Sequence, residues 1–308
     1  MNAPRSTLRI ATRGSELALW QAHFVRDTLR RLHGEALEVE LVVVTTDGDR
    51  IQDRPLHEVG GKGLFVKAIE ERLLAGEAEL AVHSMKDLPA ELPRELVIAA
   101  TPPREDPRDA LVGAAGASLA ELPAGTRVGT GSLRRAALVA RINPTVKVMP
   151  LRGNVPTRVR KVDDGELDAV ILAGAGLRRL GLHARISEFI DVERMCPSPT
   201  QGILALQCRR DDPRTQALVA PMSDPTAAVQ AAAERGFLQR LQAGCTVPVG
   251  AYAELLGDEV RVRGIIVGDG GEPYFAAAER GPASEAAAIG ARLAEALLDM
   301  GAHVVLSR

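Results

Sequence analysis

Short apolar runs alternate with segments of helical periodicity through most of this chain, and that alternation limits the fold more than any other feature. The runs are residues 8–11, 39–45, 80–83, 97–100, 111–113, 128–129, 146–149 and 169–172. Helical patterns separate many of them; after a capping Ser15, for example, apolar residues recur at positions 17, 20, 24 and 25. Strands separated by helices form parallel or mixed sheets that are covered on both faces. We therefore predict an α/β fold.

Two proline-rich breaks divide the chain. Residues 101–107 read TPPREDP and residues 197–200 read PSPT, and proline clusters of this kind mark loops. After position 224 the pattern changes, because alanine-rich helical segments at 227–242 and 283–300 flank strand candidates at 249–253, 260–267 and 273–277. This change predicts a smaller α+β domain in the C-terminal part, and a length of 308 residues allows two or three domains.

The charge distribution favours a small anionic ligand. The net charge is only -2, yet nine arginines and lysines and no acidic residue lie from Arg127 to Lys161. One basic stretch in a near-neutral chain suits a small anion better than a long polyanion. Aromatic residues make up only 3% of the sequence, which leaves few side chains for stacking on bases. We therefore expect no binding to nucleic acid.

Cysteine and histidine usage indicates a reduced protein without a metal site. The three cysteines form no CxxC pair, and the six histidines show no ligand spacing. Free thiols are typical of a reducing compartment. The N-terminal residues contain no apolar signal segment, and no apolar run is long enough to span a membrane. The sequence therefore predicts a cytoplasmic protein that binds neither a metal nor a membrane.

Arginines follow the ends of several predicted strands. In residues 129–135, GTGSLRR, a glycine-rich turn leads into a helix whose first N–H groups attract anions, and the hydroxyls of Thr130 and Ser132 add donors. Ligands of open α/β sheets bind beyond the carboxyl ends of strands, and guanidinium groups match carboxylates or phosphates. The alternative is that these charges are solvated surface residues. The arginines concerned are Arg13, Arg134, Arg135, Arg152 and Arg158.

Lys86 and Asp87 lie together after the predicted strand at 80–83. A carboxylate near cations stays ionised, so Asp87 could stabilise a cationic intermediate or relay a proton. An ordinary surface ion pair is the alternative interpretation of the same spacing. His83 fits a structural hydrogen bond, and we assign it no catalytic role.

Cys245 lies on a predicted loop, GCTVPVG at residues 244–250, where a thiolate would be an accessible nucleophile. A small buried side chain is the alternative for a lone cysteine. Cys196 and Cys208 lack such flanks and are interpreted as structural. The glycine-rich segment 60–65 does not match the phosphate-binding pattern GxxxxGK[ST], and it is either a mobile lid or a turn that enters a helix.

Taken in order, these segments resemble the porphobilinogen deaminase family. No single motif is decisive, but the matches extend over nearly the whole chain. They are residues 8–13 (LRIATR), 17–22 (LALWQA), 60–65 (GGKGLF), 81–87 (AVHSMKD), 104–110 (REDPRDA), 132–135 (SLRR), 151–154 (LRGN), 175–180 (AGLRRL), 201–202 (QG) and 244–248 (GCTVP).

The resemblance implies a monomer of three domains, formed by residues 1–102 with 201–220, residues 103–200, and residues 221–308. The first two domains would correspond to the lobes of type II periplasmic binding proteins, with mixed sheets and an active-site cleft between them. The third would be the smaller α+β domain that carries the cofactor cysteine.

The resemblance also implies a transferase that condenses four porphobilinogen molecules head to tail with loss of ammonia. One covalent dipyrromethane cofactor per chain would be attached to Cys245 through a thioether, and hydrolysis would release hydroxymethylbilane for tetrapyrrole and haem synthesis. Every pyrrole carries an acetate and a propionate. The growing chain therefore accumulates the carboxylates that an arginine-rich site would bind.

By matching position, Asp87 would stabilise the cationic pyrrole species and assist proton transfer. The residues that would bind cofactor and substrate are Arg13, Ser15, Lys62, Ser84, Lys86, Thr130, Ser132, Arg134, Arg135, Arg152, Arg158, Arg179 and Gln201. Three positions depart from the family pattern. Gly131 replaces a common serine, Thr200 replaces the usual glycine, and Asp47 stands where basic or neutral residues are frequent.

A non-enzymatic solute-binding protein with the same two-lobed fold is the alternative function, since a fold does not fix a function. A third domain with a loop cysteine, together with the missing export signal, argues against it.

Overall fold

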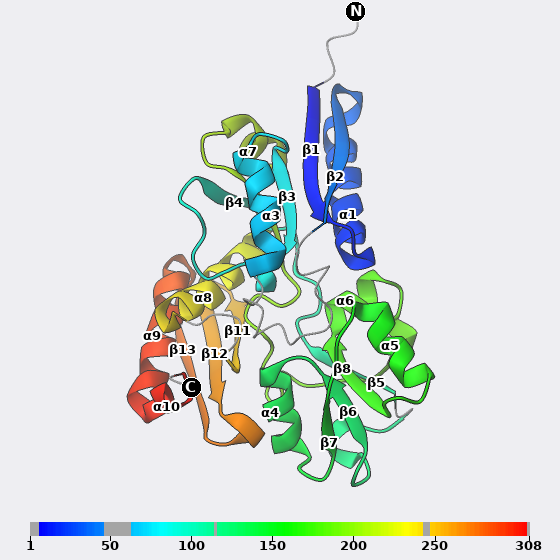
Figure 1. The fold of residues 1–308 in the computed structure, drawn as a ribbon. Coiled ribbons are helices and arrows are strands. Elements are labelled where there is room, and N and C mark those ends of the chain that lie inside the picture. The colour runs from blue at the N-terminus through cyan, green and yellow to red at the C-terminus, as the bar shows by residue number, and fades with distance from the viewer. Residues whose placement is uncertain (1–5, 46–62, 114–115, 243–246, 307–308) are drawn as a thin grey trace, which may run out of the picture. The chain divides into compact units, whose positions relative to one another are not determined.

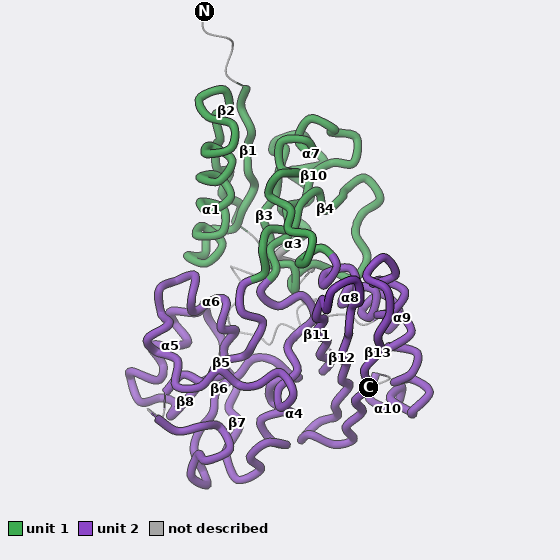
Figure 2. Tube along the Cα trace, turned by 180° about the vertical axis from the view of Figure 1, so that it is seen from behind, with its two compact units in different colours: residues 1–104, 203–228 green, residues 105–202, 229–308 purple. Residues whose placement is uncertain are grey.

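The computed structural model describes residues 6–45, 63–113, 116–242 and 247–306. The chain forms two compact units, residues 1–104 with 203–228 (unit 1) and residues 105–202 with 229–308 (unit 2; Figure 2). The first two crossings, after Arg104 and after Gly202, lie at or next to the proline-rich breaks in the sequence. The finer division into three domains remains a prediction.

Unit 1 contains a five-stranded mixed sheet in the order β2-β1-β3-β10-β4 (Figure 1). Strand β1 runs parallel to β2 and β3, whereas β10 is antiparallel to β3 and β4. The elements are β1 (Ser6–Arg13), α1 (Glu16–His33), β2 (Leu37–Val44), α3 (Gly63–Leu74), β3 (Leu80–Ser84), the 3-10 turn η2 (Met85–Asp87), β4 (Leu96–Ala100), β10 (Leu204–Arg209) and α7 (Pro213–Val219).

Both faces of this sheet are buried because its central strands are apolar at successive positions. Leu80 and Val82 belong to the core that contains the buried face of α1, and Ala81 belongs to the core that contains Ile69 of α3. Period-two alternation places such neighbours on opposite faces of a strand. The apolar segment 80–82 is therefore covered by α1 on one face of the sheet and by α3 on the other.

Unit 2 contains a second five-stranded mixed sheet, in the order β7-β6-β8-β5-β9. Strand β6 is parallel to β7 and β8, and β5 is antiparallel to β8 and β9. The elements are β5 (Asp109–Gly113), β6 (Arg127–Thr130), α4 (Leu133–Ile142), β7 (Lys147–Pro150), α5 (Val155–Asp163), β8 (Ala169–Ala173), α6 (Gly174–Arg179) and β9 (Ile186–Phe189).

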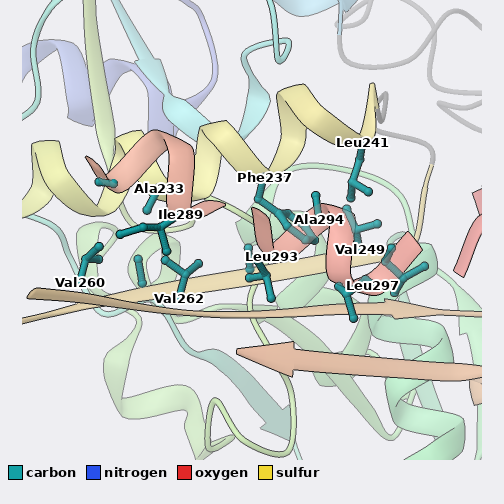
Figure 3. Close-up of a cluster of buried hydrophobic side chains, with 14 of the residues drawn as sticks. Ala233, Phe237, Leu241, Val249, Val260, Val262, Ile289, Leu293, Ala294 and Leu297 are labelled. Carbon is teal, nitrogen blue, oxygen red and sulfur yellow. The ribbon is translucent and has the colours of Figure 1, made fainter. Parts of the chain in front are cut away.

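The C-terminal part of unit 2 is a three-stranded antiparallel sheet in the order β11-β12-β13, formed by β11 (Val249–Leu256), β12 (Glu259–Val267) and β13 (Tyr274–Pro282). Helices α8 (Pro225–Leu241) and α9 (Ala286–Leu297) pack on it around Phe237 and Leu293 (Figure 3). Ile265 and Val267 of β12 instead join a core with Val128 and Leu138, which belong to β6 and α4. The two sheets of unit 2 thus share a hydrophobic core, and the predicted α/β fold with an α+β C-terminal part is confirmed.

Candidate functional site

The sheet edge at which β6, β7 and β8 end gathers most of the arginines singled out in the sequence, and we call it the unit 2 edge. Thr130 and Pro150 are register partners at the ends of the parallel strands β6 and β7. Asp109 begins the antiparallel strand β5 opposite Ala173, the last residue of β8, and therefore lies at the same edge. The predicted placement of basic residues beyond strand ends is confirmed for this sheet.

Arg134 and Arg135 at this edge are buried against one carboxylate, that of Asp109. Arg134 Nη2 lies 2.8 Å from Asp109 Oδ2, and Arg135 donates to Asp109 Oδ1 from Nε at 3.0 Å and from Nη2 at 2.7 Å. Arg134 also donates to the Cys196 carbonyl at 2.7 Å. The side chains of Arg134 and Arg135 are 4% and 8% exposed, and that of Asp109 is 0% exposed. The interpretation of these arginines as solvated surface charges is therefore wrong.

This cluster retains a positive charge. Burial would raise the pKa of Asp109, but the two guanidinium groups outweigh burial and hold that pKa below its usual range. Burial lowers the pKa of Arg134, yet a guanidinium remains protonated at neutral pH. Two positive charges and one negative charge leave the three residues at +1. An excess of buried positive charge favours an anionic ligand, because charges removed from water need a partner.

The hydroxyls of Thr130 and Ser132 shape the start of α4. Thr130 Oγ1 accepts the Ser132 N–H at 3.2 Å, and Ser132 Oγ accepts the Arg135 N–H at 3.4 Å as the N-cap. A Cβ at Gly131 would lie 2.5 Å from the Leu151 carbonyl oxygen. Glycine at position 131 therefore allows the two loops of the edge to approach each other closely.

The other three predicted arginines of unit 2 differ in burial. Arg179 at the end of α6 is buried and donates to the Gly202 carbonyl at 2.8 Å; burial lowers its pKa to about 10. Arg158 in α5 is half-buried and donates from Nε to the Gly153 carbonyl at 2.7 Å. Arg152 follows β7 and is half-buried. These side chains come from α5, α6 and the loop after β7.

The corresponding edge of unit 1 holds the other predicted residues. Arg13 is the last residue of β1 and is half-buried; Ser15 caps α1 by accepting the Ala18 N–H. Ser84 ends the parallel strand β3 and accepts a hydrogen bond from Gln21 Nε2 at 2.8 Å. Lys86 and Asp87 lie in η2, both half-buried. Because β1 and β3 are parallel neighbours, their carboxyl ends meet at one edge.

Beside Asp87, a buried hydrogen-bonded chain runs through His83, Gln207 and Glu70. His83 Nε2 lies 3.0 Å from Gln207 Oε1, and Gln207 Nε2 donates to Glu70 Oε1 at 2.8 Å. Since Glu70 fixes the orientation of the amide, Nε2 of a neutral His83 must carry the proton. Burial lowers the pKa of His83 to about 4. His83 therefore has the structural role expected from the sequence, as a neutral donor.

Lowering the pH from about 6.5 to about 4 is expected to destabilise the fold through His83 by at most about 3 kcal/mol. In this window the unfolded chain binds a proton that the folded chain does not, so stability falls as the pH falls. The check is the free energy of unfolding from urea titrations at several pH values, compared with His83→Asn. The raised pKa of the buried Glu70 acts in the opposite direction, so the difference between wild type and variant is the quantity to read. Equal slopes for both proteins would refute the expectation.

Several predicted residues lie outside the described part of the chain. They are Cys245, Lys62 and Asp47, together with the glycine-rich segment at 60–62. The two cysteines that are described fit the structural interpretation. Burial raises the pKa of the Cys196 thiol to about 12 and that of Cys208 to about 11, which keeps both protonated and poorly nucleophilic.

Across the described ranges, no three His, Cys, Asp or Glu side chains are grouped so that they could hold a metal ion. The helices in the same ranges are all too short or too polar to cross a membrane.

Sequence reasoning missed the buried polar partners of the edge. Asp109 is the counter-charge of two arginines, and Glu234, which is 0% exposed, accepts the N–H groups of Thr200 and Ala253. Asp109 had one signal, since a carboxylate at the first position of an apolar run needs a partner when it is buried. Glu234 had none, because one glutamate in a long helix is ordinarily solvated.

Comparison with protein families gives two matches in chain order. Residues 8–217 match the family described as porphobilinogen deaminase, dipyromethane cofactor binding domain. Residues 228–299 match porphobilinogen deaminase, C-terminal domain.

Individual proteins agree with the family matches. A porphobilinogen deaminase of Syntrophotalea carbinolica is 48% identical over 302 residues, which cover 98% of this chain and 96% of the relative. One from Roseiflexus sp. is 48% identical over 303 residues, which cover 98% and 99%. Among solved structures, the methionine-binding protein MetQ aligns with a TM-score of 0.43 and 15% identity over 74% of this chain and 94% of MetQ. The family matches and the relatives extend over almost all of the sequence, and the chain belongs to the porphobilinogen deaminase family.

Proposed function

We propose that the unit 2 edge binds the carboxylates of porphobilinogen and of the growing pyrrole chain. The proposed reaction condenses four porphobilinogen molecules head to tail and releases hydroxymethylbilane. As a member of its family, the chain is a transferase with a dipyrromethane cofactor. One observation carries the proposal. Arg134 and Arg135 share the single carboxylate of Asp109 and keep a net positive charge in a buried position.

The residues at this edge suit a ligand with several carboxylates. Four segments at one sheet edge supply its arginines, namely α4 with Arg134 and Arg135, the loop after β7 with Arg152, α5 with Arg158 and α6 with Arg179. Carboxylates bound by guanidinium groups form strong, directional hydrogen bonds. Each pyrrole adds an acetate and a propionate, so several binding groups are needed as the product grows. The solute-binding alternative is not adopted, because the family matches include the C-terminal domain.

Cys245 is the proposed attachment point of the cofactor. The described cysteines, Cys196 and Cys208, are buried and their thiols have raised pKa values, so neither offers a thiolate. When bound, dipyrromethane supplies the terminal pyrrole from which the product is extended. Thr130, Ser132, Lys86 and Ser84 are proposed to bind it, with Arg13, Ser15, Lys62 and Gln201.

Asp87 is the proposed catalytic residue. Its carboxylate would stabilise positive charge on a pyrrole nitrogen and accept or return a proton there. The 3-10 turn η2 places it directly after the buried strand β3. We further propose that the protein acts as a monomer in the cytoplasm.

The test is the intact mass of the denatured protein before and after incubation with porphobilinogen. Wild type, Cys196→Ala and Cys208→Ala are expected to carry an added mass equal to two linked pyrrole units, and Cys245→Ser is expected to lack it. The two buried cysteines serve as matched controls for loss of a thiol. A wild-type protein that still lacks the adduct after incubation, or a Cys245→Ser variant that keeps it, would disprove the proposed attachment.

A further inference from the structure

The loop of Thr200, Gln201 and Gly202 connects the arginines of the unit 2 edge. Gln201 Nε2 donates to Asp109 Oδ1 and to the Pro107 carbonyl, both at 2.8 Å, while its Oε1 accepts from Arg135 Nη2 at 3.2 Å. The Gly202 carbonyl accepts from Arg179 Nη2 at 2.8 Å. A shift of this loop would therefore displace a hydrogen-bond partner of Arg135 and one of Arg179 at the same time. Both arginines are proposed to bind carboxylates.

Thr200 holds this loop in a conformation that a residue other than glycine rarely adopts. Its φ is 61°, in the left-handed region, and its side chain is buried. Such a backbone costs about 1–2 kcal/mol for a residue with a Cβ. A glycine at this position would avoid that cost. Something in this chain must therefore stabilise Thr200.

The carboxylate of Glu234 is that stabilising group. One of its oxygens accepts the backbone N–H of Thr200, and the other accepts the N–H of Ala253 in β11 at 2.8 Å. Glu234 is 0% exposed. A hydrogen bond from a backbone N–H to a buried carboxylate is charge-assisted and about twice as strong as one between neutral groups.

Glu234 belongs to α8, the helix that precedes the proposed attachment cysteine. The helix ends at Leu241, seven residues and about 10 Å along the axis from Glu234, at 1.5 Å per residue. Cys245 follows four positions later in the sequence. One helix therefore leads into the cofactor loop and also holds the loop that orients Arg135 and Arg179.

We propose that Glu234 is a positioning residue, which keeps the arginines of the unit 2 edge in their carboxylate-binding arrangement by holding Thr200 in its left-handed conformation. The proposal rests on the proposed function of that edge. Glu234 does not act on the substrate; it acts through Thr200 and Gln201. Threonine at position 200 makes the loop more dependent on Glu234 than glycine would at the same φ.

The test compares Glu234→Gln with Glu234→Gln/Thr200→Gly, both as cofactor-loaded protein. Glu234→Gln is expected to raise the KM for porphobilinogen about tenfold, equivalent to about 1.4 kcal/mol of binding, with a smaller change in kcat. Adding Thr200→Gly is expected to restore most of the KM, because glycine needs no support at a φ of 61°. Glu295→Gln removes a carboxylate of an exposed ion pair with Arg240 and is the matched control, with an unchanged KM.

A second readout does not depend on turnover. Hydrogen exchange of the peptide spanning residues 197–203 is expected to be faster in Glu234→Gln and to slow again in the double variant. A KM within twofold of wild type in Glu234→Gln, or a raised KM that Thr200→Gly leaves unchanged, would overturn the proposal. If Glu234→Gln does not fold, Gln201→Met is tested in its place, because it keeps the side-chain volume and removes the amide. An unchanged KM in Gln201→Met would also overturn the proposal. If the proposed function itself is wrong, the wild-type protein will carry no pyrrole adduct and will not turn over porphobilinogen.

Discussion

Replacing Asp87 with alanine or with the isosteric asparagine is expected to lower the turnover of porphobilinogen by about a thousandfold while the protein stays folded. The reason is chemical: neither replacement carries the negative charge that would stabilise a cationic pyrrole or accept its proton. The turn has backbone hydrogen bonds that neither replacement removes. Met85 N–H donates to the Ile203 carbonyl at 2.9 Å, and Leu88 N–H donates to the Met85 carbonyl at 3.0 Å.

The measurement is the steady-state rate of product formation at saturating porphobilinogen, with the melting temperature of each variant recorded in parallel. We expect Tm changes of less than about 2 °C, because Asp87 is only half-buried and the backbone hydrogen bonds of its turn remain in both variants. Glu91→Gln, which neutralises an exposed carboxylate nearby in the sequence, should keep wild-type turnover. A folded Asp87→Asn variant with near-normal turnover would remove Asp87 from the chemistry and leave it as a surface charge.

Replacing Gly290 with alanine is expected to lower the free energy of unfolding by about 3 kcal/mol or more, the opposite of what helix propensity predicts. A Cβ at Gly290 would lie 1.9 Å from the Ala233 carbonyl oxygen, and one at Gly236 would lie 2.1 Å from the Ala287 carbonyl oxygen. The backbones of α8 and α9 thus approach each other closely at both glycines. Neither helix can yield to an added methyl group without moving away from the core around Phe237 and Leu293.

Urea denaturation followed by circular dichroism would measure this effect. Ala288→Gly, at an exposed position of the same helix, is the control and should cost only the intrinsic difference of about 1 kcal/mol. Gly290→Ala with wild-type or higher stability would mean that α8 and α9 can separate freely. Because α8 also carries Glu234, we expect Gly290→Ala to reduce cofactor loading as well, read from the intact mass.

The sequence was sufficient for the fold class and for the position of most elements. The helix expected at 227–242 is α8 at Pro225–Leu241, and the strand expected at 260–267 is β12 at Glu259–Val267. These features follow from local signals, since periodicity, caps and prolines act on neighbouring residues. The placement of Arg13 at the end of a strand, and of Arg134 and Arg152 after strand ends, was predictable for the same reason.

The partners of those residues were decided by the tertiary structure. Gln201 and Asp109 are 92 positions apart and hydrogen-bonded, as are Gln207 and Glu70 at 137 positions. Such pairs depend on strand order, and the antiparallel strand β5 is what brings Asp109 to the edge where the parallel strands end. The sequence alone determined that basic side chains follow strand ends. Only the fold decided that two of them are buried around one carboxylate, because burial and pairing arise when distant segments exclude water from the same space.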